Sequence, residues 1–257
     1  MNKAGARHGQ EAFVLHHYDW SESSQILDLF TREQGRVPVA AKGSKRPYSQ
    51  LRAVLLPFQR ILVHLSKPAK GAEGEGVLTL RSAEWQGGAT QPPGAALFSG
   101  YYLNELLMKL LGRQDPHPEL FDLYAETLAE LHSAEEPQAQ AALRAFELRL
   151  LFILGLLPDL SLATLTQEPV KAGHRYAVSA QAGVIMAPGD DLAQLDGATL
   201  VQLQAALLHG SGAALRHACQ TALQPLRAVL RSLLLYHLGG QPLRTRQLMI
   251  DVQKLIE

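Results

Sequence analysis

The amino-acid sequence predicts an α+β protein with an amino-terminal β-barrel followed by an all-α carboxy-terminal domain. Short apolar runs broken by turn-forming residues fill positions 1–86, and longer runs with helical periodicity begin after a Gly- and Pro-rich segment at 87–94. Charge divides the chain as well, because residues 32–60 are strongly basic whereas residues 115–136 are acidic. We therefore expect two domains, at 1–86 and 95–257.

Five short apolar segments, with β-branched and aromatic members, predict the strands of the first domain. Turn-forming residues separate them, and a Gly- and Lys-rich stretch divides the last two. The expected strands are 12–16, 25–30, 37–41, 58–65 and 76–81. Five strands within roughly 80 residues suggest a small barrel or sandwich, and the OB fold is the five-stranded barrel that fits this count.

The second domain is predicted to be helical because its apolar residues recur every three to four positions. Asp115-Pro116 and Pro137 supply helix-start signals. The expected helices are 97–111, 116–132, 137–153, 200–209, 223–238 and 245–256. An irregular insertion is expected near 160–192, with a small hairpin at 176–178 and 184–186.

Composition indicates a sizeable apolar core without disulfides, since 47% of the 257 residues are hydrophobic. The single cysteine, Cys219, lies in a helical pattern and is expected to be an inert buried thiol. No apolar run follows the basic first ten residues, and the most apolar stretch, 148–157, is too short to span a bilayer. We expect a cytoplasmic protein with no membrane contact.

A basic run at the third predicted strand is the most informative local feature. The chain has 24 basic and 24 acidic residues, so only the distribution of charge can indicate a polyanionic partner. Residues 35–52, GRVPVAAKGSKRPYSQLR, join a strand edge to a glycine-containing turn that can project cations and backbone amides toward phosphate. Tyr48 and Phe58 are candidates to stack on bases, although core packing is the favoured alternative for Phe58. The alternative for the whole run is an ordinary solvated loop.

A second candidate surface lies in the helix expected at 137–153. Arg144 and Arg149 border Phe146 and other apolar residues, and an apolar groove rimmed by arginines suits an acidic peptide with an apolar tip. The same pattern occurs at Arg216, Arg227 and Arg231. In both places a core helix with arginines extended along its surface is the alternative, and it is favoured.

No motif of a known class of enzyme is present. The sequence has no Walker loop, GxGxxG or HExxH pattern, and its ten histidines are scattered. A hydrolase built around these histidines and Asp190-Asp191 is a remote alternative. We expect a protein that is not an enzyme, with no catalytic residues, no metal and no cofactor.

Four motifs occur in order along nearly the whole chain. The first, AFVLHHYDWSESSQILDLFTREQGRVPVAAKGSKRPYSQLRAVLLPF, covers most of the predicted barrel. LRSAEWQ followed by LFSGYYLNELLMKLL spans the change to helices, and ALRAFELRLLFILG and YHLGGQPLRTRQL complete the series. This ordered set resembles the RecO family of DNA repair and recombination proteins.

The resemblance implies an OB-like domain followed by a helical domain, and a function as a recombination mediator. RecO proteins bind single- and double-stranded DNA and anneal complementary strands. In the RecFOR pathway they work with RecR and RecF, bind the acidic tail of single-stranded DNA-binding protein (SSB), and allow RecA to load on the coated strand. The resemblance thus implies a bacterial protein of the cytoplasm that associates with the nucleoid during repair.

The resemblance also agrees with the candidate residues. The expected DNA contacts are Arg36, Lys42, Lys45, Arg46, Arg52, Arg244 and Arg246. Arg144, Phe146 and Arg149 are the candidates to bind the SSB tail.

In one respect the chain departs from the family pattern. Many members bind zinc through four cysteines in the helical domain, whereas residues 164–191 contain no cysteine. The chain resembles the zinc-free, proteobacterial-type branch, so no zinc is expected. The alternative function is that of a protein-interaction scaffold whose basic barrel face binds acidic partners instead of DNA.

Overall fold

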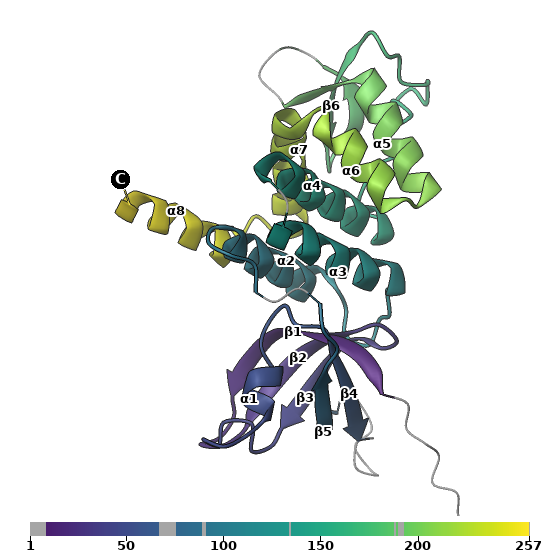
Figure 1. The fold of residues 1–257 in the computed structure, drawn as a ribbon. Coiled ribbons are helices and arrows are strands. Elements are labelled where there is room, and N and C mark those ends of the chain that lie inside the picture. Colours follow the sequence, from purple (N-terminus) through teal and green to yellow (C-terminus); the bar gives the residue numbers. More distant parts are fainter. Residues whose placement is uncertain are drawn as a thin grey trace, which may run out of the picture. The chain divides into compact units, whose positions relative to one another are not determined.

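The structure is a computed structural model that describes residues 9–66, 76–88, 91–133, 135–187, 189 and 193–256 (Figure 1). It contains two compact units. The barrel unit combines the chain up to His132 with the segment from Arg244 onward, and the helical unit is Ser133–Leu243.

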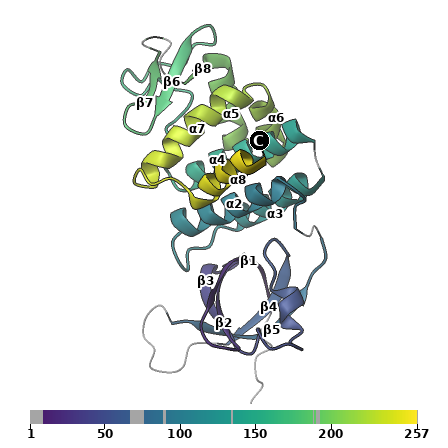
Figure 2. The same ribbon diagram turned by 90° about the vertical axis from the view of Figure 1, so that its left-hand side faces the viewer.

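Five strands close into a barrel in the order β1-β2-β3-β5-β4 (Figure 2). The pairing of β3 with β5 is parallel, and the other pairings are antiparallel. The strands are β1 (Gln10–Asp19), β2 (Gln25–Thr31), β3 (Gly35–Ala41), β4 (Ile61–Ser66) and β5 (Leu78–Trp85), with the short helix α1 (Leu51–Val54) between β3 and β4. This arrangement confirms the predicted OB-like barrel.

The inside of the barrel is filled by apolar side chains from alternate positions of the strands. Val14, Leu27, Leu29, Val39 and Ile61 are fully buried there. The alternation explains why the strands could be recognised in the sequence. The ends of the strands could not be recognised in the same way, because β1 and β5 continue into exposed residues beyond the alternating pattern.

The fourth strand begins later than expected because Phe58 leaves the strand direction. Its backbone has a positive φ of 71°, and its ring is buried against Tyr101, 4.9 Å between ring centroids. A Cβ on Gly100 would lie 2.9 Å from this ring. Phe58 is therefore a core residue, which confirms the packing alternative.

Helices α2 (Ala96–Leu110) and α3 (Pro118–Ser133) cover one outer face of the barrel. Phe13 and Phe30 point out of the barrel and meet Phe121 of α3 at centroid distances of 5.1 and 5.4 Å. Such aromatic contacts add to the burial of apolar area. These helices thus share a second apolar core with the barrel.

A buried arginine joins β3 to the end of α2. Arg36 forms a two-point pair with the Asp28 carboxylate at 2.9 and 3.1 Å. Its remaining terminal nitrogen donates to the carbonyls of Met108 and Leu111, which the last turn of α2 leaves without helical partners. The adjacent Gly35 has φ +66°, and a Cβ there would lie 2.1 Å from the Asp115 carbonyl oxygen. The Gly-Arg pair therefore forms the joint between barrel and helices.

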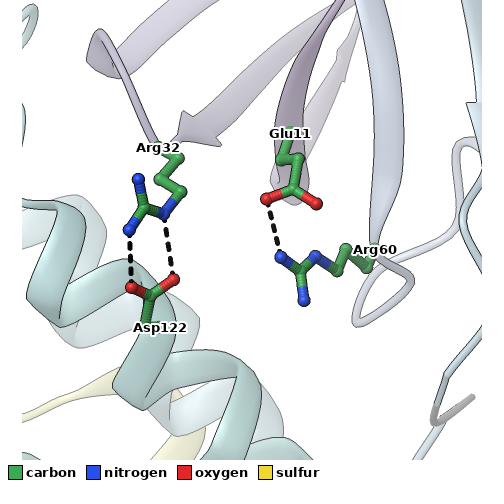
Figure 3. A network of polar contacts seen from close by, with 4 residues as sticks. All are labelled: Glu11, Arg32, Arg60 and Asp122. Carbon is green, nitrogen blue, oxygen red and sulfur yellow. Dashed lines mark hydrogen bonds and ion pairs between the residues drawn. The ribbon is translucent and has the colours of Figure 1, made fainter.

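Two further ion pairs of the barrel unit are partly exposed (Figure 3). The Arg32 guanidinium donates hydrogen bonds of 3.0 and 2.8 Å to the Asp122 carboxylate of α3, and Arg60 donates to Glu11 at 2.6 Å. The hydrogen bonds from Arg32 lower the pKa of Asp122. Because these side chains are 32–46% exposed, solvent weakens the pairs, and they add less than the buried one.

The last helix, α8 (Arg244–Ile256), is attached to α2 through Glu105. This carboxylate accepts the backbone N–H groups of Arg244 and Thr245, both at 2.9 Å, and the Thr245 hydroxyl. The first turn of α8 contains no acidic residue, so Glu105 satisfies the free amides and complements the positive end of the helix. Burial alone raises the pKa of Glu105, but these hydrogen bonds outweigh it and lower the pKa below its ordinary value.

The helical unit surrounds the long helix α4 (Glu136–Ile153). The other helices are α5 (Gly197–His209), α6 (Gly212–Gln220) and α7 (Leu223–His237). The hairpin predicted in the insertion is confirmed as β6 (Arg175–Ser179) and β7 (Gly183–Met186), and a strand that was not predicted, β8 (Gln194–Asp196), pairs with β6. The carboxy-terminal region is therefore mostly helical but includes a three-stranded sheet.

We expect Arg36→Met to destabilise the barrel unit strongly. The change leaves the Asp28 carboxylate buried without its partner, and loss of one member of a buried pair costs about 3–5 kcal/mol. Urea unfolding followed by circular dichroism measures the free energy of unfolding. Arg32→Met is the matched control, because its pair with Asp122 is half exposed and its loss should matter far less. Equal losses in the two variants would contradict the role given to Arg36.

We expect the attachment of α8 to weaken as the pH falls below about 4.5, the ordinary pKa of Glu105. A carboxylate whose pKa is lowered in the folded state stabilises that state above its unfolded pKa and loses the effect when it is protonated. Hydrogen exchange of the α8 amides measures the attachment. Glu105→Gln keeps a hydrogen-bond acceptor but removes the charge. The α8 amides of this variant should therefore exchange faster at neutral pH, and their exchange should depend less on Glu105 protonation as the pH falls. A steep dependence retained in this variant would exclude Glu105 as its cause.

Candidate nucleic-acid interface

The basic run lies mainly in the connection from β3 to α1, beside the loop that joins β1 to β2. The Lys45 amide donates to the Ser23 carbonyl at 3.0 Å, and the Gly43 amide donates to the Ser24 hydroxyl at 3.3 Å. Gly43 has φ +73°, a conformation that favours glycine. The two loops therefore form one surface, here called the loop surface, which comprises residues 20–24 and 42–52.

Three cations of the loop surface are exposed and have no ion pair with any carboxylate that the structure describes. They are Lys42, Arg46 and Arg52. Lys45 differs, because its ammonium contacts Asp19 at 3.1 Å and donates to the Ser21 carbonyl. The available positive charge is thus smaller than the sequence suggests and is concentrated around one turn.

Arg36 is not part of this surface, which corrects the expectation that it contacts phosphate. Only 7% of the residue is exposed. Its donors are directed to Asp28 and to the end of α2. A phosphate could reach it only if the buried pair broke, so its position in the basic motif reflects a structural role.

Of the two aromatic residues singled out in the sequence, only Tyr48 lies on the loop surface. Tyr48 is 99% exposed, whereas Phe58 is 1% exposed. The contribution of the β1–β2 loop was missed by sequence reasoning. The serines of the SESS motif were the available signal, because short hydroxyl side chains commonly bond to backbone amides in turns.

The second pair of expected DNA contacts lies on a different element. Arg244 and Arg246 begin α8, which packs beside α2 (Figure 1). The Arg244 side chain is exposed and that of Arg246 is half-buried. The Arg244 backbone amide already bonds to Glu105, so this helix start offers no open amide there for an anion. Their part in DNA binding stays a prediction.

The residues expected to hold an acidic peptide are buried inside the helical unit, which corrects that expectation. Phe146 is 0% exposed, and Arg144 and Arg149 are 8% and 6% exposed. Arg144 pairs with Glu147 on the same helix at 2.9 Å, and Arg149 donates to the Leu207 carbonyl in the last turn of α5. Neighbouring helices cover α4, so the core alternative is correct here.

Helix α7 presents cations that are exposed instead. Arg227 and Arg231 lie one turn apart on its exposed side, and Leu235, one turn further, is 41% exposed. A hollow of about 560 Å³ opens at the start of this helix. Its lining comprises Arg175, Gln194, Leu195, Asp196, Thr221, Ala222, Leu223, Gln224 and Pro225.

Other candidate chemistry finds little support in the described part of the chain. No three His, Cys, Asp or Glu side chains there gather closely enough to hold a metal ion. Cys219 is buried as expected, and burial, followed by the charge of Glu147, raises the pKa of its thiol to about 12. Asp190 and Asp191 lie outside the described residues. No described helix has the length and apolar character needed to cross a membrane.

Comparison with known proteins assigns both halves of the chain. The family described as "Recombination protein O N terminal" matches residues 6–86, and "Recombination protein O C terminal" matches residues 94–247. A protein named DNA repair protein RecO from Polaromonas naphthalenivorans is 50% identical over 247 residues, covering 96% of this chain and 97% of the relative. Proteins of the same name from Polaromonas sp. JS666 and Albidiferax ferrireducens are 50% and 47% identical, over 98% and 96% of this chain and 100% and 96% of their own lengths. The chain therefore belongs to the RecO family of DNA repair proteins.

Proposed function

We propose that this protein is a non-catalytic recombination mediator that binds single- and double-stranded DNA and anneals complementary strands. With RecR, and with RecF where it is present, it promotes the loading of RecA on SSB-coated DNA in the bacterial cytoplasm. The observation that carries the proposal is the cluster of exposed cations on the loop surface of an OB-like barrel, Lys42, Arg46 and Arg52. Loops of OB barrels are a common place for oligonucleotides to bind.

The loop surface can promote annealing by reducing charge repulsion. Each cation that contacts a phosphate neutralises one charge and releases counterions, whatever the base sequence. Two strands held this way repel each other less, so complementary bases meet more often. Because only a few cations are available, the summed affinity for phosphates stays modest in physiological salt, and the duplex can leave once it has formed.

The acidic tail of SSB requires cations beside an apolar surface, and α7 offers both. Arg227, Arg231 and Leu235 lie along one side of this helix, and Gln224 continues that side into the hollow at its start. Acidic side chains would meet the arginines while an apolar tip enters the hollow. We therefore assign the tail to this side of α7 in place of the buried residues of α4.

A protein-interaction scaffold is the alternative function, because exposed cations also attract acidic proteins. The two functions differ in what they predict for bare DNA. A scaffold binds acidic partners but neither binds naked strands in a salt-dependent manner nor accelerates their annealing.

Replacing Lys42, Arg46 or Arg52 by alanine should each lower the slope of log affinity against log salt concentration by about one unit, since each change removes one phosphate contact. Fluorescence anisotropy with a labelled single strand measures affinity over the salt series. Lys171→Ala removes one exposed positive charge from the helical unit and should leave the slope unchanged. A triple variant with the wild-type slope would rule out this site.

Annealing of dye-labelled complementary strands tests the function itself. The protein should accelerate annealing of bare and SSB-coated strands, and rising salt should abolish the effect. The double variant Arg227→Ala, Arg231→Ala should lose acceleration on coated strands but keep it on bare strands, because only coated strands need the tail contact. No acceleration of bare strands at low salt would favour the scaffold.

A further inference from the structure

The outer half of β1 carries exposed aromatic side chains on one face. His16 and Tyr18 are two positions apart on the strand, so their side chains point to the same side. Their rings meet edge to face with centroids 4.5 Å apart. Trp20 follows directly after the strand. Tyr18 is 48% and Trp20 57% exposed, and His16 is exposed as well.

These three residues, here called the aromatic row, do not contribute to the core of the barrel. The β1–β2 register shifts between Val14 and His16, and from that point β1 turns from buried to exposed residues. Single exposed aromatic residues are common on protein surfaces. These three lie close together in sequence on one hairpin, and clusters of exposed apolar side chains commonly mark binding sites.

The aromatic row overlaps the loop surface at Trp20. Trp20 begins the loop whose Ser23 and Ser24 bond to the amides of Lys45 and Gly43. Asp19, between Tyr18 and Trp20, is paired with Lys45 at 3.1 Å, which leaves Glu22 as the carboxylate of this loop without a described ion pair. Aromatic faces and cations therefore lie together, and the Asp19 carboxylate between them is neutralised by Lys45.

We propose that His16, Tyr18 and Trp20 form a stacking site for the unpaired bases of single-stranded nucleic acid, while the loop surface holds the phosphates. The proposal rests on the proposed function and adds a base-dependent contact to it. Combined stacking platforms and basic grooves are the general means of binding single strands without sequence preference. Partial desolvation, then the neighbouring His17, lowers the pKa of His16 despite the opposing charge of Asp28, which favours the neutral form of the ring.

A comparison of two oligonucleotides separates stacking from phosphate binding. The probes are oligo(dT) and an abasic strand of equal length, which has the same phosphates but no bases. Wild type should prefer oligo(dT). Tyr18→Ala and Trp20→Ala should each weaken binding of oligo(dT) roughly tenfold, leave the abasic strand nearly unchanged and keep the salt slope. Trp20→Phe should restore most of the preference, and Tyr236→Ala, which removes a similarly exposed ring from the helical unit, should have no effect.

Tryptophan fluorescence supplies a second measurement. Trp85 is the other tryptophan of the chain, so a Trp85→Phe background isolates Trp20. Oligo(dT) should quench this emission more strongly than the abasic strand.

Several results would overturn the proposal. The first is equal binding of oligo(dT) and the abasic strand by wild type. The second is an equal loss of affinity for both strands in Tyr18→Ala and Trp20→Ala. The third is that these variants bind DNA normally but no longer bind a protein partner. Wild type that binds neither strand would instead overturn the proposed function, and the stacking site with it.

Discussion

The buried pair of Arg36 and Asp28 is the interaction on which the barrel unit depends. It links neighbouring strands β2 and β3, and the same guanidinium closes the end of α2 through two carbonyls. A buried charge is costly unless it is fully paired, so the site tolerates one arrangement of strand and helix. With α2 held there, the Phe58 ring packs against Gly100 of α2, and Glu105 of α2 accepts hydrogen bonds from the start of α8. The joint thereby positions the connection after β3, where the exposed cations lie.

Buried arginines explain most of the differences between expectation and structure. Arg36 and Arg149 were both expected to bind ligands, and each instead donates to the carboxy-terminal end of a helix distant in sequence, Arg36 at α2 and Arg149 at α5. A helix end and a guanidinium are complementary in charge and hydrogen bonding. The partners are far away in sequence, at Leu111 and Leu207, so local spacing carries no sign of them. A motif rich in arginine therefore cannot distinguish a ligand site from a helix cap until the tertiary contacts are known.

The fold was more accessible to sequence reasoning than the site. Strand alternation around Leu27 and Val39 and helical periodicity in α2 to α4 are local patterns, and they predicted the barrel and the main helices correctly. The short α6 was indicated only as a helical pattern at Cys219 and was given no bounds, because its nine residues include several small and polar ones. The local basic pattern indicated the cations of the loop surface that prove to be exposed, and their role stays a prediction. The other half of this surface, the serine loop before β2, depends on hydrogen bonds that no local pattern reveals.

A mediator must hold single strands and then release the duplex, and the distribution of charge suits this requirement. The protein is neutral overall, and carboxylates within the chain neutralise Arg32, Arg36, Lys45 and Arg60 of the basic segment 32–60. Under the proposed function, the cations that remain, Lys42, Arg46 and Arg52, would supply a weak, salt-sensitive hold on any phosphate backbone. Stacking on Tyr18 and Trp20 requires an unpaired base, because a paired base is already stacked within its helix. If the proposed stacking site operates, pairing would remove the stacking contact while leaving the phosphates, so the affinity of the protein for the strand would fall as the duplex forms. Release would then follow from the annealing step itself, without a source of energy such as ATP.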